Sequence, residues 1–208
     1  MDFRKLQRSS SPITDYDYKC LKGMDASFFE YKLSSLNQNF IKQLLGWKVL
    51  TQTPLLPDHP INSLGKGTFS NILEKNIDLS APTSIHLAVT ESGNLLGSAG
   101  FSSLDWAESH SKLYIFLDPK QSSEPRVWGR LISIVLHLLM RCAFTHFNFS
   151  KVSIETPNSD IVLVHTIEAS GFRREAEFKD YTKINSELVD MIYATCTKES
   201  YLRTFPES

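Results

Sequence analysis

Glu155 is the residue whose type and position most directly suggest chemistry. It belongs to the segment Lys151–Thr156, where strand alternation puts the valine and the isoleucine on one face and Ser153 with Glu155 on the other. A carboxylate that faces a substrate cleft can accept a proton as a general base. A solvated strand residue and an ion-pair partner are the simpler interpretations of the same carboxylate.

Histidine is the other side chain that can exchange a proton near neutral pH. The chain has six histidines, of which His86 and His110 lie on or near predicted strands and His165 lies in a predicted helix. A single histidine among six is more often a surface residue or a hydrogen-bonded core residue. His165 is the one that we keep as a candidate catalytic acid.

The segment 64–68 has the sequence Leu-Gly-Lys-Gly-Thr, which at first sight resembles a phosphate-binding loop. It lacks the upstream glycine of that motif, glycine follows the lysine, and no clear strand precedes it. The segment belongs to residues 51–68, which contain three prolines and two glycines and are predicted to form a long irregular loop. A flexible loop is therefore the preferred interpretation.

The elements that must position these residues follow from the hydrophobic periodicity after residue 83. The pattern predicts strands at 84–89, 95–101, 111–117 and 151–156, helices at 127–146 and 160–170, a final hairpin of 173–182 and 188–196, and a polar tail. The longer helix is apolar apart from one narrow polar stripe, so it should pack against a sheet. The strand–helix–strand order predicts a right-handed crossover that makes strands 111–117 and 151–156 parallel neighbours in a mixed sheet.

The first 83 residues are less regular. Residues 1–14 are predicted to be a disordered arm, and Tyr16–Leu21 is predicted to be a strand. Short helices are expected at Ala26–Leu33, Gln38–Leu45 and Thr68–Lys75. We therefore expect a single domain at 15–208, with a helical N-terminal part at 15–83 and a core at 84–198.

The composition narrows the classes of function. Lys plus Arg total 22 and Asp plus Glu total 23, so the basic excess typical of a nucleic-acid binder is missing. The three cysteines are far apart and not in metal-binding spacing, so neither a disulfide framework nor a metal site is expected. The polar N-terminus resembles no signal peptide, and the apolar run 131–145 is interrupted by Ser133, His137 and Arg141. The sequence thus predicts a cytoplasmic protein that does not span a membrane.

Several short motifs follow one another in residues 84–198. They are a hairpin glycine in Asn94–Gly97, a strand end at Leu117–Pro119, Arg126–Leu131 at the start of the long helix, Ala143-Phe144 at its end, Asn158 after the next strand, and Gly171–Glu175 after the second helix. Each motif alone is weak, and their order and spacing are the signal. In this order the segment, a little over half of the chain, resembles the GNAT superfamily of N-acyltransferases, closest in style to enzymes that acetylate ribosomal-protein N-termini.

The resemblance implies an α/β fold (α+β mixed sheet) whose central sheet splays open, with acetyl-CoA or another acyl-CoA as co-substrate and no metal. The pyrophosphate of the acyl-CoA would lie at the start of the long helix, where free N–H groups, a small residue and arginines favour an anion. The pantetheine would follow the strand before the helix. The implied contacts are Ile115, Phe116, Leu117, Arg126, Val127, Trp128, Gly129, Arg130, Leu131 and Asn158, the last of which could instead belong to a helix N-cap.

Two positions depart from the family pattern. Leu131 replaces a small residue of the loop, and Ile167 replaces the tyrosine that serves many members as general acid. These departures leave two functions open. One is an enzyme in which Glu155 deprotonates an amine, and water or a nearby group such as His165 protonates the leaving thiolate. The other is a weak or inactive module that binds acyl-CoA or a protein partner. The acceptor could be an amine-bearing small molecule, a peptide or a protein N-terminus. A monomer and a homodimer are both compatible with the sequence.

Overall fold

Residues 84–197 contain several extended apolar runs and one long apolar helix. In the structure the runs are strands of a sheet, and the helix packs on one face of it. The computed structural model describes residues 15–18, 31–35, 38–47, 84–118, 120, 123–184 and 187–206. In chain order its elements are β1 (Asp15–Tyr18), β2 (Tyr31–Ser35), α2 (Gln38–Trp47), β3 (Ile85–Glu91), β4 (Asn94–Asp105), β5 (His110–Leu117), α5 (Pro125–Arg141), the π-helical turn η3 (Cys142–His146), β6 (Lys151–Pro157), α6 (Ile161–Ala169), β7 (Arg173–Ile184), β8 (Glu187–Thr197) and α7 (Lys198–Thr204).

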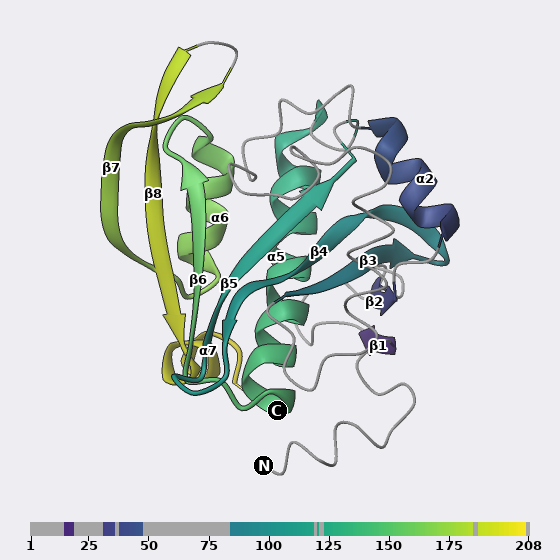
Figure 1. Cartoon of the computed structure of the whole chain (residues 1–208), viewed down its shortest axis with the longest axis horizontal. Coiled ribbons are helices and arrows are strands. Elements are labelled where there is room, and N and C mark those ends of the chain that lie inside the picture. The colour runs from purple at the N-terminus through teal and green to yellow at the C-terminus, as the bar shows by residue number, and fades with distance from the viewer. Residues whose placement is uncertain are drawn as a thin grey trace.

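The described strands form one mixed sheet in the order β1-β2-β3-β4-β5-β6-β8-β7. Every neighbouring pair is antiparallel except β5 and β6, which are parallel and joined by the crossover through α5. Both strands start at the lower end of the view in Figure 1 and separate toward the top. The predicted mixed sheet, the parallel pair and its divergence are confirmed.

Helices cover both faces of the sheet. One face, called the α2 face below, carries Phe116, whose ring centroid lies 6.3 Å from that of Trp47 at the end of α2. The opposite face, called the α5 face, is covered by α5 and α6, which pass behind the strands in Figure 1. Because side chains alternate along a strand, even-numbered residues of β5 lie on the α2 face and odd-numbered ones on the α5 face.

α5 is the core helix of the domain. Ten of its side chains are buried, as the narrow polar stripe in its sequence predicts. The segment Pro125–His146 is long and apolar enough to cross a membrane by length and composition, but 72% of its most apolar window is buried inside the protein. Its apolar character is thus explained by packing within the domain. The free thiol of Cys142 in the π-helical turn is also buried, and this burial raises its pKa.

The N-terminal part corrects one prediction. Residues 31–33, expected at the end of a helix, belong to strand β2, which pairs with β3 so that Leu33 lies opposite Val89. The helix prediction was wrong there because five residues are too few to distinguish the two-residue period of a strand from the 3.6-residue period of a helix. Pairing with β3 makes the segment a strand. The strand at β1 and the helix at α2 are confirmed over the residues described. The predicted arm 1–14, the loop 51–68 and the helix Thr68–Lys75 lie outside the described residues.

The predicted polar tail is instead a short helix, α7. The Thr197 side chain caps it by accepting a hydrogen bond from the Ser200 N–H at 3.2 Å. Tyr201 and Phe205 then pack against the buried His137 of α5, with ring centroids 5.6 and 4.5 Å away. Tyr201, Leu202 and Phe205 are the apolar residues of this segment, and they are too few to show a helical stripe. Docking on α5 supplies the stabilisation that periodicity did not reveal.

The buried histidines lead to a prediction about stability against pH. Burial lowers the pKa of His137 from 6.5 to about 4, assisted by the charge of Arg141, and burial lowers the pKa of His86 to about 4. Between these values the unfolded chain binds more protons than the folded one, so acid favours unfolding. We expect the free energy of unfolding to fall as the pH drops from about 6.5 to about 4, by about 1.4 kcal/mol per pH unit for each histidine.

Urea unfolding of the parent and of His137→Leu between pH 4.5 and 7.5 tests this expectation. The variant should lose one titrating group, so below about pH 6.5 its stability should vary less steeply with pH, by about 1.4 kcal/mol per unit. Carboxylates contribute equally to both proteins and cancel in the difference. Equal slopes for the two proteins would show that His137 does not resist protonation in the folded state.

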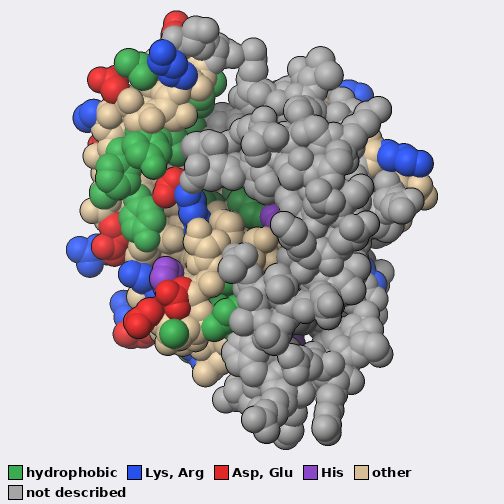
Figure 2. Space-filling model, in the orientation of Figure 1, with side chains coloured by type: hydrophobic (Ala, Val, Ile, Leu, Met, Phe, Trp, Pro, Cys, Tyr) green, Lys and Arg blue, Asp and Glu red, His purple; other side chains and the backbone are tan. Residues whose placement is uncertain are grey.

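β7 forms the outer edge of the sheet and is exposed along most of its length. Its pairing with β8 shifts register between Arg174 and Ala176 and again between Phe178 and Thr182, and such bulges interrupt an edge that could otherwise pair with another chain. Apolar side chains gather over the two-stranded ribbon of β7 and β8 in Figure 2. The exposed large apolar residues of the ribbon are Phe178, Tyr181 and Leu188, at 42%, 53% and 55%.

Candidate functional site

The opening between β5 and β6 is the feature around which the candidate site is built. The two strands pair over three residues only, the last pair being Lys112 with Ser153. Beyond this pair each strand continues for four or more residues without the other as its neighbour. This opening is called the split below. A polar ligand with an extended chain can replace the missing strand contacts there.

The backbone register tells which groups face the split. Asp118 N–H donates to the carbonyl of Leu96 on β4 at 2.8 Å, and the register is regular from there to Lys112. Since successive residues of an antiparallel pair direct their N–H and C=O groups to opposite sides, Ile115 and Leu117 point theirs toward the split and Phe116 toward β4. The prediction that pantetheine contacts 115–117 stays a prediction. Ile115 and Leu117 present backbone groups to the split, and Phe116 directs its own to β4.

β6 offers its backbone in the same way. Asn158 N–H donates to the carbonyl of Asp190 on β8 at 2.9 Å, so even-numbered residues of β6 are bonded to β8 and Glu155 directs its N–H and C=O toward the split. Thr156 lies beside it on the α5 face. Its hydroxyl is buried and has no hydrogen-bond partner among the described residues. Sequence reasoning missed Thr156, because a threonine in a strand is too common to be a signal.

The N-terminus of α5 lies next in the chain after β5 and is open to a ligand. Glu124 occupies the N-cap without a capping side-chain bond, Pro125 follows with no N–H, and Trp128 N–H donates to the Glu124 carbonyl at 2.9 Å. The N–H groups of Arg126 and Val127 are thus the ones left without a partner inside the helix. An uncapped helix start with an exposed arginine fits the phosphates of a CoA.

The side chains of the predicted phosphate-binding loop, residues 126–131, differ in their exposure to solvent. Arg126 and Val127 are exposed, the latter at 44%, whereas Trp128 and Leu131 belong to the core. Arg130 is half-buried. Burial raises the pKa of Tyr31 on β2, and the charge of Arg130 opposes this rise. Of the two arginines predicted to meet a phosphate, Arg126 alone is exposed at the helix start.

Gly129 has a packing role that the sequence did not reveal. A Cβ on this residue would lie 3.1 Å from Thr166 Oγ1 and 3.5 Å from Val162 Cγ1, both on α6. The absent side chain therefore allows α6 to approach α5 closely. The prediction that Gly129 admits a phosphate stays a prediction, and a bulky substitution there would disturb the helix packing as well as any ligand.

Glu155 faces the α2 face, as the alternation predicts. Lys112 Nζ lies 2.7 Å from Glu155 Oε2, and the two side chains are only 20% and 14% exposed. This ion pair joins β5 to β6 at the vertex of the split. The carboxylate is therefore the ion-pair partner that the sequence allowed, and its role as a general base stays a prediction.

Tyr114, His86 and Ser98 form a second polar group on the α2 face. The Tyr114 hydroxyl lies 2.6 Å from His86 Nδ1 and 3.3 Å from Ser98 Oγ. Burial raises the pKa of Tyr114 and lowers that of His86 to about 4, so both are neutral at pH 7. These residues come from three strands, and no sequence spacing could have brought them together.

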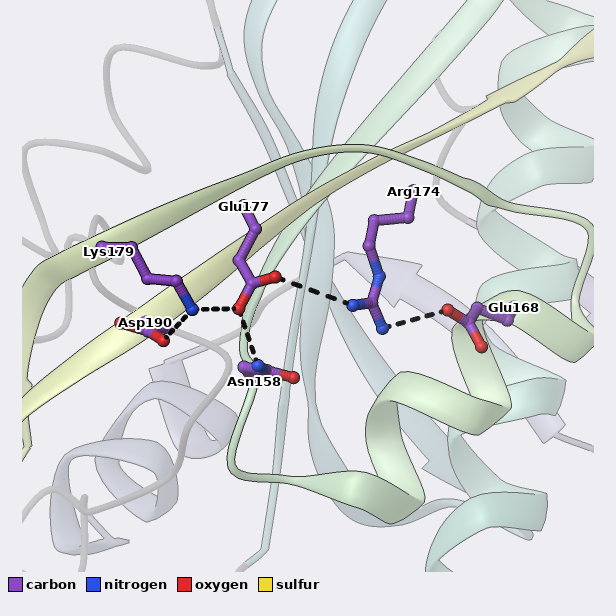
Figure 3. A network of polar contacts seen from close by, with 6 residues as sticks. All are labelled: Asn158, Glu168, Arg174, Glu177, Lys179 and Asp190. Carbon is purple, nitrogen blue, oxygen red and sulfur yellow. Dashed lines mark hydrogen bonds and ion pairs between the residues drawn. The ribbon is translucent and has the colours of Figure 1, made fainter.

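Asn158 belongs to a network of polar contacts that Figure 3 shows running from α6 to β8. Its amide donates to Glu177 Oε1 at 2.8 Å, and Lys179 Nζ lies 2.9 Å from the same oxygen and 2.7 Å from Asp190 Oδ2. Arg174 continues the network to Glu168 of α6 at 3.3 Å. Asn158 is not the N-cap of α6, because Asp160 accepts the capping bond from Leu163 N–H. Its predicted contact with the cofactor stays a prediction, and one of its two amide N–H groups already donates to Glu177.

The remaining predicted groups lie on α6. His165 is exposed on the outer side of this helix, and Ile167 is buried in the core. Ile167 therefore offers no hydroxyl where the resemblance implies a tyrosine acid. In the described part of the chain, no three side chains among His, Cys, Asp and Glu gather as ligands for a metal ion.

A comparison with known protein families gives a match over more than half of the chain. Residues 66–193 match the acetyltransferase (GNAT) domain family. No curated protein sequence matches the chain.

Several solved structures share the fold. Spermidine N-acetyltransferase from Vibrio cholerae in complex with CoA and spermine superposes with a TM-score of 0.69 at 16% identity, covering 83% of this chain and 98% of that chain. The Vibrio cholerae spermidine/spermine N-acetyltransferase in complex with manganese ions gives 0.66 at 15% identity, with 83% and 95% covered. A probable acetyltransferase gives 0.64 at 15% identity, with 81% and 93% covered.

Proposed function

This chain belongs to the GNAT family of acetyltransferases, which transfer an acetyl group from acetyl-CoA to an amine, and we propose that its acceptor is a small amine bound on the α2 face beside the split. The observation that supports this proposal is the divergence of β5 and β6 directly after Lys112 and Ser153, next to the uncapped start of α5. The divergence leaves backbone groups for an extended ligand arm, and the helix start leaves N–H groups for phosphates.

In the proposal each element has one task. The N–H groups of Arg126 and Val127 and the Arg126 guanidinium bind the pyrophosphate. The backbone edges at Ile115 and Leu117 bind the pantetheine amides and polarise the thioester carbonyl. Glu155 accepts the proton of the acceptor amine on the α2 face. Acetyl-CoA supplies the activated acyl group.

A small amine is favoured as acceptor over a peptide or a protein N-terminus for one reason. The similar structure with CoA and spermine aligns over nearly its whole length, so the same arrangement of elements accommodates a small polyamine elsewhere. The test is acetyl transfer to a panel containing spermidine, a simple monoamine and a peptide with a free N-terminus. Transfer to the peptide alone would contradict the small-amine proposal. We also propose that the reaction takes place in the cytoplasm.

Binding of the co-substrate can be measured before any acceptor is known. Acetyl-CoA at a hundred times its Kd should stabilise the folded state by about 2.7 kcal/mol, which is a rise in Tm of roughly 5–10 °C for a chain of this size. Arg126→Gln should reduce this rise at a fixed acetyl-CoA concentration, because it removes the exposed cation at the helix start.

Arg141→Gln is the matched control, since Arg141 is exposed at the opposite end of the same helix. It should keep the full rise in Tm. An equal loss in both variants would mean that Arg126 acts through general charge only. A parent protein whose Tm does not respond to acetyl-CoA, CoA or longer acyl-CoAs would contradict the binding site itself.

A further inference from the structure

Tyr114 lies in a row of three residues that crosses three strands. It is opposite Gly100 on β4, and Gly100 is opposite His86 on β3. A Cβ on Gly100 would clash with the Ile85 carbonyl and would lie 3.0 Å from both Cε1 and the hydroxyl of Tyr114. The tyrosine ring therefore lies over the glycine, and this position brings its hydroxyl to His86.

The hydroxyl of Tyr114 is held from two strands. Its distances are 2.6 Å to His86 Nδ1 and 3.3 Å to Ser98 Oγ, and the imidazole packs against the tyrosine ring with centroids 5.3 Å apart. His86 and Tyr114 are both neutral at pH 7, because burial disfavours their charged forms by lowering the pKa of His86 and raising that of Tyr114. The contact at pH 7 therefore joins two neutral groups.

The position of this row in the sheet suggests its task. Tyr114 stands between Leu113 and Ile115, where β5 has lost its pairing with β6. From there on, β4 is the neighbouring strand that holds β5 in the sheet. The Tyr114 hydroxyl reaches away from the split, toward β3, so it cannot be the group that donates a proton to the acyl carrier. The contact between Tyr114 and His86 is a side-chain link from β5 to β3, beside the backbone edge of β5 that must be rigid.

We propose that His86, acting through Tyr114, is a positioning residue that holds the open edge of β5, and with it the Ile115 and Leu117 N–H groups, in register for the thioester carbonyl. This inference rests on the proposed function. Backbone donors stabilise a developing oxyanion only when they are placed to within a fraction of an ångström. A strand with one free edge needs an additional restraint to meet that requirement, and the link from β3 supplies it.

Amide hydrogen exchange in the presence of acetyl-CoA tests the proposal without an acceptor. In the parent, saturating acetyl-CoA should slow exchange at the Ile115 and Leu117 amides. Tyr114→Phe keeps the ring over Gly100 and removes the hydroxyl, and His86→Leu removes its partner. Both variants should lose at least about threefold of this protection, whereas exchange in β8 should match that of the parent.

Kinetics give a second readout that a merely structural role would not change. Tyr114→Phe and His86→Leu should each lower kcat by about tenfold, with the acetyl-CoA Kd and the acceptor KM within twofold of the parent. The double variant should lose no more than either single one, because both remove the same contact. His86→Asn, whose amide can bond the hydroxyl again, should recover part of the rate.

His110→Leu is the matched control, as a half-buried histidine at the paired end of β5, and it should leave protection and kcat unchanged. Unaltered protection at Ile115 and Leu117 in both variants overturns the proposal, and so does a normal kcat. A parent that acetylates no amine but shows the expected loss of protection in the variants would instead contradict the proposed function and leave the positioning role supported.

Discussion

Replacing Glu155 by glutamine is expected to lower kcat/KM for the amine acceptor by roughly a hundredfold to ten-thousandfold at neutral pH. An amine with a pKa of roughly 10 is protonated at pH 7 and cannot attack a thioester until it loses that proton. Glutamine keeps the shape of the side chain and its contact distance to Lys112, but it cannot accept the proton. Steady-state rates at several pH values, with the acetyl-CoA Kd measured separately, give the comparison.

The pH dependence makes this prediction specific. As the pH approaches 10, more of the acceptor is neutral in solution, so the difference between parent and Glu155→Gln should shrink. Glu187→Gln, an exposed glutamate on β8, is the matched control and should retain the parent rate. A Glu155→Gln variant with the parent's rate at neutral pH and intact acetyl-CoA affinity would show that positioning alone carries the reaction.

The geometry around Glu155 explains why this residue can serve as the base. Its backbone N–H and C=O face the split, while its side chain lies on the α2 face with one oxygen 2.7 Å from Lys112 Nζ. The ion pair restrains the carboxylate at the vertex where β5 and β6 part. A base fixed by a partner at the vertex loses little conformational freedom when the substrate binds.

Removing a backbone donor from the edge of β5 is expected to have the second largest effect. Ile115→Pro and Leu117→Pro each delete one N–H that faces the split without breaking a bond to β4. At least one of the two variants should lose about a hundredfold to a thousandfold in kcat, as expected for the loss of an oxyanion donor. Proline is tolerated in strands where its missing N–H lies at an open edge.

Each proline variant has an alanine partner that separates the donor from the side chain. Ile115→Ala and Leu117→Ala truncate a buried side chain but keep the N–H, so the ratio of kcat between the paired variants isolates the donor. Circular dichroism and the Tm verify that all four proteins fold. Folded proline variants with turnover within threefold of their alanine partners would exclude both N–H groups as the donors that polarise the carbonyl.

The elements of residues 84–197 could be predicted because each has a single clear period. The strands alternate, and α5 repeats its apolar residues at helical spacing, so local sequence and burial favour the same structure. The right-handed crossover then placed β5 parallel to β6. The prediction failed at β2 and α7, where five or seven residues are too few to establish a period. There, pairing with β3 and docking on His137 decided the structure.

The sequence by itself determined the fold class, the helix start that could receive phosphates and the face of β6 on which Glu155 lies, because these depend on neighbours a few residues apart. Only the tertiary structure decided that Lys112 pairs with Glu155, that Gly129 serves the packing of α5 against α6, and that Tyr114 is tied to His86 across Gly100. These contacts join residues from different elements. Their partners are selected by strand register and helix packing, which depend on the whole chain.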